Sequence, residues 1–276
     1  MGSASQNGNS AEFSQARLFV TDFDGAAFDT FEPPVGGVGV DEAYRIAIGE
    51  VFGGLALARY DEEGGHKNRT PTEIAQSLSP DTSGRGLKSN ARQLVDVKLD
   101  ILLEQIGLPT TGGKPWPQPI RGFEAFWSGV SMARKDGTPL STGVLSAGHT
   151  EFIERCFESA GLEMPDFMYT HETAEGLYAN VPVENLAKPS PVPMEIITSL
   201  WLSKLFANAQ EAAQLSRSQI KDRILYSGDD VYRDRKLAEN ADVDFVHIPA
   251  INPENGWEVA ALRLHLGSLA IEGAEQ

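Results

Sequence analysis

The feature that most constrains this chain is a short apolar run that ends in two closely spaced carboxylates, Arg17-Leu18-Phe19-Val20-Thr21-Asp22-Phe23-Asp24-Gly25. A buried strand over Leu18–Thr21 would carry Asp22 and Asp24 past its C-terminal end, where open α/β sheets place their ligands. Because alternate residues of an extended chain face the same way, the two carboxylates can converge on one site. Two carboxylates this close repel each other and stay ionised together only beside a cation, so the pair favours a site for a divalent metal. The alternative interpretation is an acidic turn that closes the strand.

Length, charge and cysteine content narrow the class of protein. The chain has 276 residues, 41% of them hydrophobic, which is enough for a core domain and a smaller second one. Its net charge of -16 argues against nucleic acid or an anionic membrane as a partner. The single cysteine, Cys156, excludes an internal disulfide framework and suits a reducing, cytoplasmic compartment. No apolar run approaches the roughly 18 residues of a membrane span. Residues 1–15 are small and polar, and we expect a flexible tail there.

Helical signals dominate the interval from 34 to 115. After a glycine-rich linker, Asp41–Ile48 begins with acidic residues typical of a helix N-terminus. The sequence Thr70–Glu73 combines a cap, an early proline and a following acid, which predicts another helix start. Apolar residues recur at helical spacing from Val95 to Ile106, before a glycine and a proline. We expect an inserted helical domain here.

From about residue 116 short apolar runs alternate with helical patterns. The expected strands are Leu140–Leu145, Phe167–Thr170, Ile224–Ser227 and Phe245–Ile248, and the expected helices are Arg121–Arg134, Phe152–Ala160, Pro193–Phe206 and Arg233–Asn240. This alternation predicts an α/β fold with a Rossmann-like parallel sheet that helices cover on both faces. The core domain would then comprise residues 16–33 and 116–276, with the helical domain at 34–115.

Two more polar residues follow expected strands of this sheet. Ser146 ends the run Val144-Leu145 just before a helix, where a hydroxyl and backbone N–H groups can hold phosphate oxygens. An N-cap turn is the alternative interpretation. Lys188 precedes a proline in an extended segment, and its ammonium can neutralise an anion and a neighbouring carboxylate. A solvent-exposed lysine is the alternative there.

A second acidic group follows the expected strand Ile224–Ser227, in the sequence Gly228-Asp229-Asp230, with Asp234 one turn later. Hard oxygen ligands of this kind suit magnesium, which normally keeps several waters and one substrate oxygen. A solvated acidic loop is the alternative.

The order Asp-x-Asp, Ser, Lys, Gly-Asp and a later Asp resembles the haloacid dehalogenase-like hydrolase superfamily, especially its phosphatases with a helical C1-type cap after the first motif. The resemblance covers residues 17–249. It implies that Asp22 is the nucleophile and Asp24 the general acid/base. It further implies phosphate binding by Ser146, Ala147 and Lys188, and magnesium binding by Asp22, Asp24, Asp229 and Asp234.

The chain departs from the superfamily pattern at one position and is ambiguous at another. Ala26 stands where the superfamily usually has Thr or Val, and loss of that hydroxyl could loosen the loop or slow the chemistry. Either Asp229 or Asp230 fits the spacing to Asp234, and we favour Asp229 because it follows Gly228 directly.

Basic residues before the cap helix are candidates for substrate contact. Lys67 or Arg69 can bind a second anionic or hydroxylated part of the substrate, or can lie in an exposed basic loop. His149 follows the serine motif, and for a loop histidine we expect a structural or solvated role.

The resemblance implies an HAD-like phosphatase that hydrolyses a small organic phosphomonoester through an aspartyl-phosphate, with Mg2+ as cofactor. The expected partner is a small phosphorylated metabolite such as a sugar phosphate, phosphoglycolate or a nucleotide-like compound. The protein would be a cytoplasmic monomer or homodimer. Alternatives are a phosphomutase or phosphotransferase on the same scaffold and a catalytically weak phosphate-binding protein. A signalling receiver domain is a further alternative, but receiver domains are shorter than this chain and carry their acidic pair and phosphorylated Asp on separate strands. The presence of Asp24 argues against the dehalogenase branch.

Overall fold

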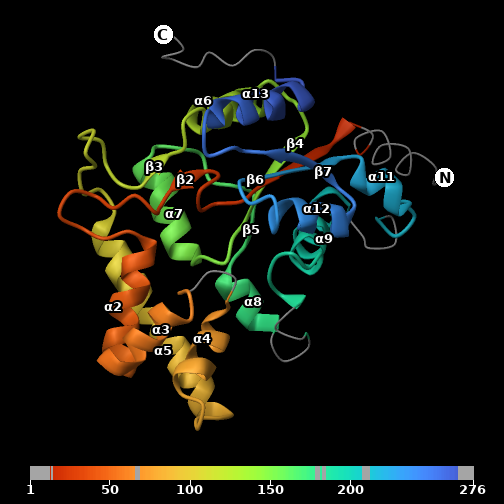
Figure 1. The fold of residues 1–276 in the computed structure, drawn as a ribbon. Helices are drawn as coiled ribbons and strands as arrows, with labels where there is room; N and C mark the ends of the chain where they lie inside the picture. Colours follow the sequence, from red (N-terminus) through yellow and green to blue (C-terminus); the bar gives the residue numbers. More distant parts are fainter. Residues whose placement is uncertain are drawn as a thin grey trace. The chain divides into compact units, whose positions relative to one another are not determined.

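The computed structural model describes residues 13, 15–65, 69–177, 181, 185–206 and 212–266. The chain divides into two compact units, one formed by Met1–Asp29 with Pro119–Gln276 and the other by Thr30–Gln118. The first, called the core unit below, contains a parallel sheet (Figure 1), and the second is called the helical unit. The sequence predicts an inserted domain at 34–115, whereas the helical unit spans Thr30–Gln118.

The core unit is built on a five-stranded parallel sheet of order β5-β4-β1-β6-β7. Its strands are β1 (Arg17–Thr21), β4 (Leu140–Leu145), β5 (Phe167–Tyr169), β6 (Ile224–Gly228) and β7 (Asp244–His247). The central strand β1 places Thr21 opposite Val144 on one side and opposite Ser227 on the other. The strand order reverses at β1, so its C-terminal end is the switch point where such sheets bind ligands. The predicted Rossmann-like α/β fold is confirmed.

Alternate residues of β1 build the two faces of the core. Leu18 and Val20 belong to a buried cluster with side chains of α9 (Val192–Leu205) and α12 (Asp234–Ala241). Phe19 instead meets aromatic rings of α6 (Phe123–Lys135) and α13 (Pro253–Arg263), with centroids 4.9–6.5 Å apart. In Figure 1, α6 and α13 run side by side along one face of the sheet. Burying each large apolar side chain contributes about 1.5–3 kcal/mol, which fixes the strand.

Shorter elements complete the core unit. They are α7 (Thr150–Ser159), α8 (His171–Leu177) and α11 (Arg217–Lys221). A two-stranded sheet joins β2 (Phe28–Asp29) to β3 (Gln118–Pro119), and the boundary between the units falls within β3. The sequence patterns did not predict α8, α11, α13 or this small sheet. The helix α11 has only five residues, too few to show an apolar periodicity.

The helical unit contains α2 (Val40–Phe52), α3 (Gly54–Glu62), α4 (Pro71–Leu78) and α5 (Arg85–Gln105). At the start of α4, Thr70 Oγ1 accepts from the Glu73 N–H at 3.2 Å, and a Glu73 carboxylate oxygen accepts from the Thr70 N–H at 2.6 Å. This capping box is the helix start that the sequence predicted. Buried residues Leu94, Val95 and Leu102 of α5 recur at helical spacing.

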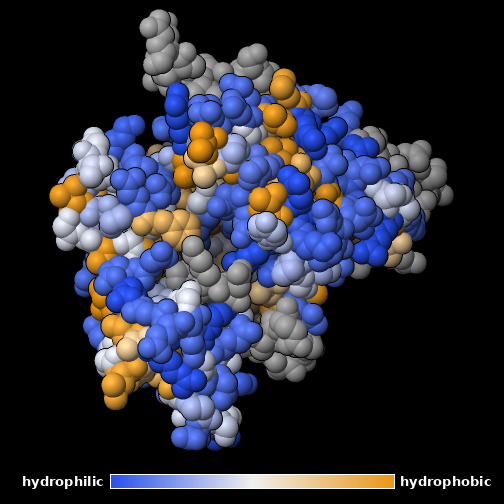
Figure 2. Space-filling model, in the orientation of Figure 1, coloured by the Kyte–Doolittle hydropathy of each residue, from blue (hydrophilic) through white to orange (hydrophobic). Residues whose placement is uncertain are grey.

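The face of the molecule in Figure 2 is mostly hydrophilic. The face in Figure 2 shows hydrophobic residues scattered among hydrophilic ones, as expected for a chain with net charge -16. Among the described helices, none combines the length and the apolar character that crossing a membrane requires.

Candidate active site

The loop after β1 holds Asp22 in a fixed direction. The Asp22 N–H donates to Ser227 O at 2.8 Å, which continues the pairing of β1 with β6 by one residue. The Asp22 Oδ1 accepts from the Phe23 N–H at 2.8 Å. The chain then turns back, because the Gly25 N–H donates to Phe28 O at 2.8 Å and Gly25 has a φ of 78°, a conformation that favours glycine. The backbone alone therefore places this carboxylate at the end of the central strand.

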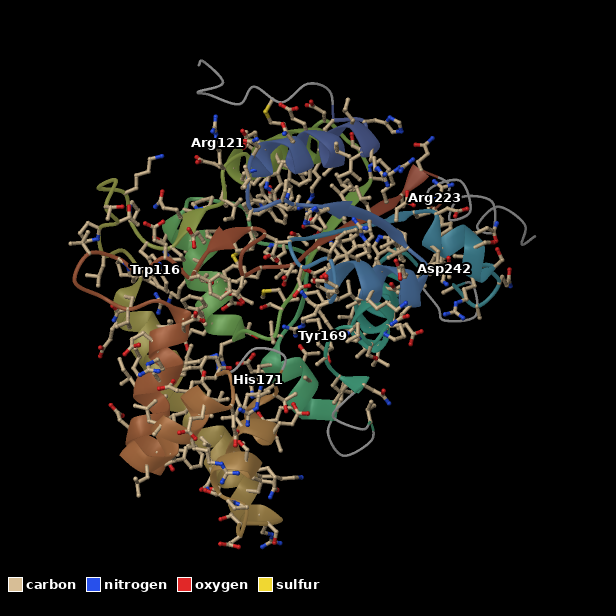
Figure 3. The ribbon with its side chains drawn as sticks, in the orientation of Figure 1. Trp116, Arg121, Tyr169, His171, Arg223 and Asp242 are labelled. Carbon is tan, nitrogen blue, oxygen red and sulfur yellow. The ribbon has the colours of Figure 1, made fainter. Side chains whose placement is uncertain are left out.

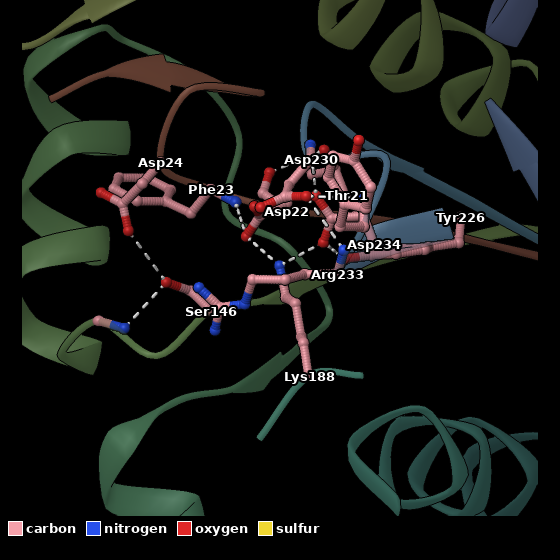
Figure 4. A network of polar contacts seen from close by, with 12 residues as sticks. Thr21, Asp22, Phe23, Asp24, Ser146, Lys188, Tyr226, Asp230, Arg233 and Asp234 are labelled. Carbon is pink, nitrogen blue, oxygen red and sulfur yellow. Dashed lines mark hydrogen bonds and ion pairs between the residues drawn. The ribbon is translucent and has the colours of Figure 1, made fainter. Parts of the chain in front are cut away.

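Lys188 joins two carboxylates from different parts of the chain. Its Nζ lies 2.5 Å from Asp22 Oδ1 and 2.7 Å from Asp234 Oδ1. Figure 4 shows the ammonium between the two acids, and only 9% of the lysine side chain is exposed. These are charge-assisted hydrogen bonds, which are about twice as strong as neutral ones. The lysine thus ties the end of β1 to the start of α12.

Asp234 is the most enclosed acid of the site. Its carboxylate accepts from the Tyr226 hydroxyl at 2.6 Å and from the Asp230 N–H at 3.0 Å. A Cβ at Gly228 would lie 2.6 Å from Asp234 Cβ, so only glycine allows this close approach. Sequence reasoning missed Tyr226 because it stands in an apolar strand. A buried phenol usually finds a hydrogen-bond partner, but the sequence does not show which residue supplies it.

Three carboxylates gather at this point. Oxygens of Asp22, Asp229 and Asp234 all lie within 4.8 Å of one another. The Asp24 carboxylate, which the resemblance also assigned to magnesium, is not in this group of described residues. Its Oδ2 instead accepts a hydrogen bond from Ser146 Oγ at 3.4 Å. The geometry gives Asp24 a place on the serine side of the loop.

The two neighbouring acids, Asp229 and Asp230, make different contacts. Asp230 Oδ1 accepts from the N–H groups of Tyr232 at 2.7 Å and Arg233 at 3.0 Å. This carboxylate therefore closes the turn before α12, whereas Asp229 lies in the acidic group. Asp229 is the residue that the sequence favoured.

The serine motif forms a tight turn between β4 and α7. Ser146 is 2% exposed, and its hydroxyl accepts from the Gly148 N–H at 2.9 Å while donating to Asp24. Ala147 is exposed at the tip of this turn. The serine and the lysine thus contact different members of the Asp22–Asp24 pair, and together they flank the loop.

Burial and like charges shape the acidity of the group. Burial raises the pKa of Asp22 well above its ordinary value, and the charges of Asp234 and Asp229 add to this effect, although Lys188 opposes it. Burial, with the charge of Asp234, also raises the pKa of Asp229 to about 6. The pKa of Asp234 is lowered because the ammonium of Lys188 and the Tyr226 hydroxyl outweigh its burial. Three acids share one ammonium, so the group has a deficit of positive charge.

Of the two predicted substrate residues of the helical unit, Arg69 is among the described residues. Lys67 lies outside the described residues. Arg69 forms an ion pair with Glu63 at 3.0 Å, and its guanidinium also donates to Gly65 O at 3.3 Å and to Ser77 Oγ. The guanidinium is therefore held by neighbours within its own unit.

Comparisons with known proteins give similarity in structure only. No family model matches the chain, and no curated protein matches it. A similar solved structure is CbbY from Rhodobacter sphaeroides in complex with phosphate, at 14% identity over 85% of this chain and 86% of that one, with a TM-score of 0.48. Another is the HAD-hydrolase YfnB from Bacillus subtilis bound to magnesium, at 12% identity over 85% and 89%, with a TM-score of 0.41. At these identities the likeness concerns the fold alone.

The similar structures include more than one activity. L-2-haloacid dehalogenase from Xanthobacter autotrophicus is 14% identical over 89% of this chain and 83% of that one, with a TM-score of 0.40.

Proposed function

We propose that this chain is a magnesium-dependent phosphatase that hydrolyses a small organic phosphomonoester through an aspartyl-phosphate on Asp22. The observation that carries the proposal is the placement of Lys188 between Asp22 and Asp234, with Asp229 completing an acidic group at the end of β1. Substrates of this class include sugar phosphates, phosphoglycolate and nucleoside monophosphates. A site of this kind supplies a nucleophile, a lysine for the phosphoryl oxygens and hard donors for a cation.

The residues present fit a magnesium ion. Carboxylate oxygens are the donors that magnesium prefers, and the deficit of positive charge around Asp22 favours a further cation. Asp22, Asp229 and Asp234 would hold it. When bound, it would offset the negative charge of the phosphoryl oxygens.

Asp22 would act as the nucleophile. Its carboxylate oxygen forms a bond to phosphorus while the bond from phosphorus to the ester oxygen breaks, which leaves an aspartyl-phosphate. Asp24 gives a proton to the departing oxygen, and the alcohol leaves. Asp24 then takes a proton from the water that attacks the phosphorus, so that inorganic phosphate leaves and Asp22 returns as a carboxylate. Splitting one step into two in this way lowers the barrier.

Ser146, Ala147 and Lys188 would hold the phosphoryl oxygens during both steps. The serine hydroxyl lies beside Asp24, in the turn that leads into α7. The lysine adds a full positive charge beside the nucleophile. We assign the choice of substrate to the helical unit, with Lys67 and Arg69 as the predicted contacts.

A catalytically weak phosphate-binding protein is the second candidate. The observation behind it is Ala26, which is fully buried in the loop and carries no hydroxyl. Such a protein would bind magnesium and phosphate without turnover.

The test measures phosphate release from a panel of small phosphomonoesters, with and without magnesium, for wild type, Asp22→Asn and the exposed control Asp136→Asn. We expect magnesium-dependent release that Asp22→Asn loses by at least about a thousandfold and that Asp136→Asn keeps. Turnover retained in Asp22→Asn would remove this residue from the nucleophile role. Isomerised sugar phosphate would indicate a mutase, halide release from 2-chloropropionate a dehalogenase, and phosphate binding without release the second candidate.

A further inference from the structure

The helix that follows the serine turn takes its N-terminal cap from another helix. At α7 (Thr150–Ser159), the N-cap residue His149 makes no side-chain hydrogen bond to cap the helix within the described residues. Glu172 of α8 supplies it instead. Its Oε2 accepts from the Thr150 N–H at 3.0 Å and from the Thr150 hydroxyl at 2.9 Å. A carboxylate at this position also complements the positive end of the helix dipole.

The other oxygen of the same carboxylate orients His149. Glu172 Oε1 lies 2.6 Å from His149 Nδ1, and the histidine side chain is only 4% exposed. The second ring nitrogen, Nε2, is buried and makes no hydrogen bond within the part of the chain that the structure describes. Glu172 therefore provides the only polar restraint on this ring among the described residues.

Further contacts join the start of α8 to the serine turn. The His171 N–H donates to Gly148 O at 2.9 Å, and Thr170 Oγ1 lies 2.8 Å from Thr150 Oγ1. Figure 3 places His171 at the head of α8, directly after the end of β5. Two consecutive residues of α8 thus form hydrogen bonds to two consecutive residues of the turn: His171 to Gly148, and Glu172 to His149.

The turn transmits this restraint to the serine hydroxyl. Ser146 Oγ accepts from the Gly148 N–H at 2.9 Å, and a Cβ at Gly148 would lie only 3.1 Å from that oxygen. Because the turn has so little room, a shift of Gly148 or His149 moves the hydroxyl relative to Asp24. The position of Ser146 therefore depends on the contact of His149 with Glu172, which stands 23 residues further along the chain than the histidine.

The carboxylate keeps its charge under ordinary conditions. Burial alone would raise the pKa of Glu172, but the hydrogen bonds from His149 and from the Thr150 N–H hold it below its ordinary value. An ionised Glu172 accepts stronger hydrogen bonds than a neutral side chain would.

We propose that Glu172 is a positioning residue for the phosphate-binding turn, which it holds through His149 and the first N–H of α7. The inference rests on the proposed function, since it concerns the same Ser146. Glu172 touches no reacting atom, and its effect is on how tightly the turn binds a phosphoryl group.

The test measures the dissociation constant of inorganic phosphate by calorimetry in magnesium buffer, for wild type, Glu172→Ala, Glu172→Gln and Glu175→Ala. Glu175 is an exposed acid of the same helix and serves as the matched control. We expect Glu172→Ala to weaken phosphate binding about tenfold, because the free energy that a helix loses with its cap corresponds to a change of that size in an equilibrium constant. Glu172→Gln should weaken binding less, because it retains one acceptor oxygen. Magnesium affinity, measured without phosphate, should be the same in all four proteins.

A merely structural role would lower the melting temperature of Glu172→Ala and leave phosphate binding well below that temperature unchanged. That result, or an equal effect of Glu175→Ala, overturns the inference and leaves the proposed function intact. If Glu172→Ala does not fold, Glu172→Gln decides by the same measurement. If wild type neither binds phosphate nor releases it from any ester, the proposed function fails and this inference fails with it.

Discussion

At the scale of single residues, the phenol of Tyr226 and the side chain of Asp234 form one unit. The hydroxyl donates to Asp234 Oδ1 at 2.6 Å, and the same oxygen lies 2.7 Å from Lys188 Nζ. Burial, with the charges of Asp234 and Asp22, raises the pKa of Tyr226 well above its ordinary value, so the phenol keeps its proton. It therefore acts as a donor and holds the carboxylate toward the acidic group.

We expect Tyr226→Phe to weaken magnesium activation, because Asp234 then loses a donor that fixes its direction. The half-saturating magnesium concentration should rise about threefold to tenfold, and the free energy of unfolding should fall by about 1 kcal/mol. Tyr232→Phe is the matched control, since Tyr232 is 87% exposed. Magnesium titrations and urea unfolding measure the two quantities. Equal magnesium dependence in both variants would contradict the role.

Sequence reasoning succeeded for the residues whose chain position fixes them. Asp22 follows a buried strand directly, as the sequence pattern predicted. It did not reveal the contacts of Glu172 or Tyr226. Both act across tertiary contacts, and neither stands in a pattern that announces a partner.

At the scale of elements, Asp166 connects three parts of the core unit. Its carboxylate accepts from Arg134 of α6 at 2.9 Å, from Lys204 of α9 at 2.7 Å and from the Thr142 N–H of β4 at 2.8 Å. Only 9% of the side chain is exposed. The acid thus ties helices from both faces of the sheet to β4, immediately before β5 begins.

The charge of Asp166 should stabilise the fold at neutral pH. Burial alone would raise its pKa, but the hydrogen bonds from Lys204 and the Thr142 N–H, with the charge of Arg134, hold it below the ordinary value. A pKa that is lower in the folded state adds stability above the unfolded value, about 3.9 for an aspartate, and that stability is lost as pH falls through the folded value.

Asp166→Asn should therefore lower the free energy of unfolding by about 1–3 kcal/mol at pH 7, as expected for the loss of hydrogen bonds to a charged group. The difference from wild type should shrink as pH falls below about 4, where the wild-type acid becomes protonated. Urea unfolding across this range measures it, with exposed Asp136→Asn as the control. A difference that is constant with pH would show that charge is not involved.

At the scale of the whole molecule, negative charge is concentrated where the proposed function needs a cation. The chain carries a net charge of -16, and three of its acids meet within 4.8 Å at the end of the central strand. The repulsion among acidic side chains spread over the surface and the repulsion among these three acids respond differently to added ions. Any salt screens the surface, whereas only a bound cation relieves the acidic group.

Magnesium should raise the melting temperature of the core unit more than potassium chloride of equal ionic strength does. At a hundred times its dissociation constant a ligand adds about 2.7 kcal/mol, which is about 5–10 °C for a unit of this size. Asp229→Asn should lose most of the excess shift and keep the effect of salt. Calorimetric scans with magnesium, potassium chloride and chelator measure this. An equal shift from both salts in wild type would argue against a magnesium site.

The sequence by itself determined the alternation of strands and helices, the helix start at Thr70 and the placement of polar residues at strand ends. These features follow from local causes, namely apolar periodicity, helix capping and the short apolar runs that form strands. Only the tertiary structure decided that Lys188 lies between Asp22 and Asp234, that Asp230 closes a turn, and that Glu172 caps α7. The reason is physical. Such contacts join segments far apart in the chain, and their geometry depends on how the sheet and its helices pack together.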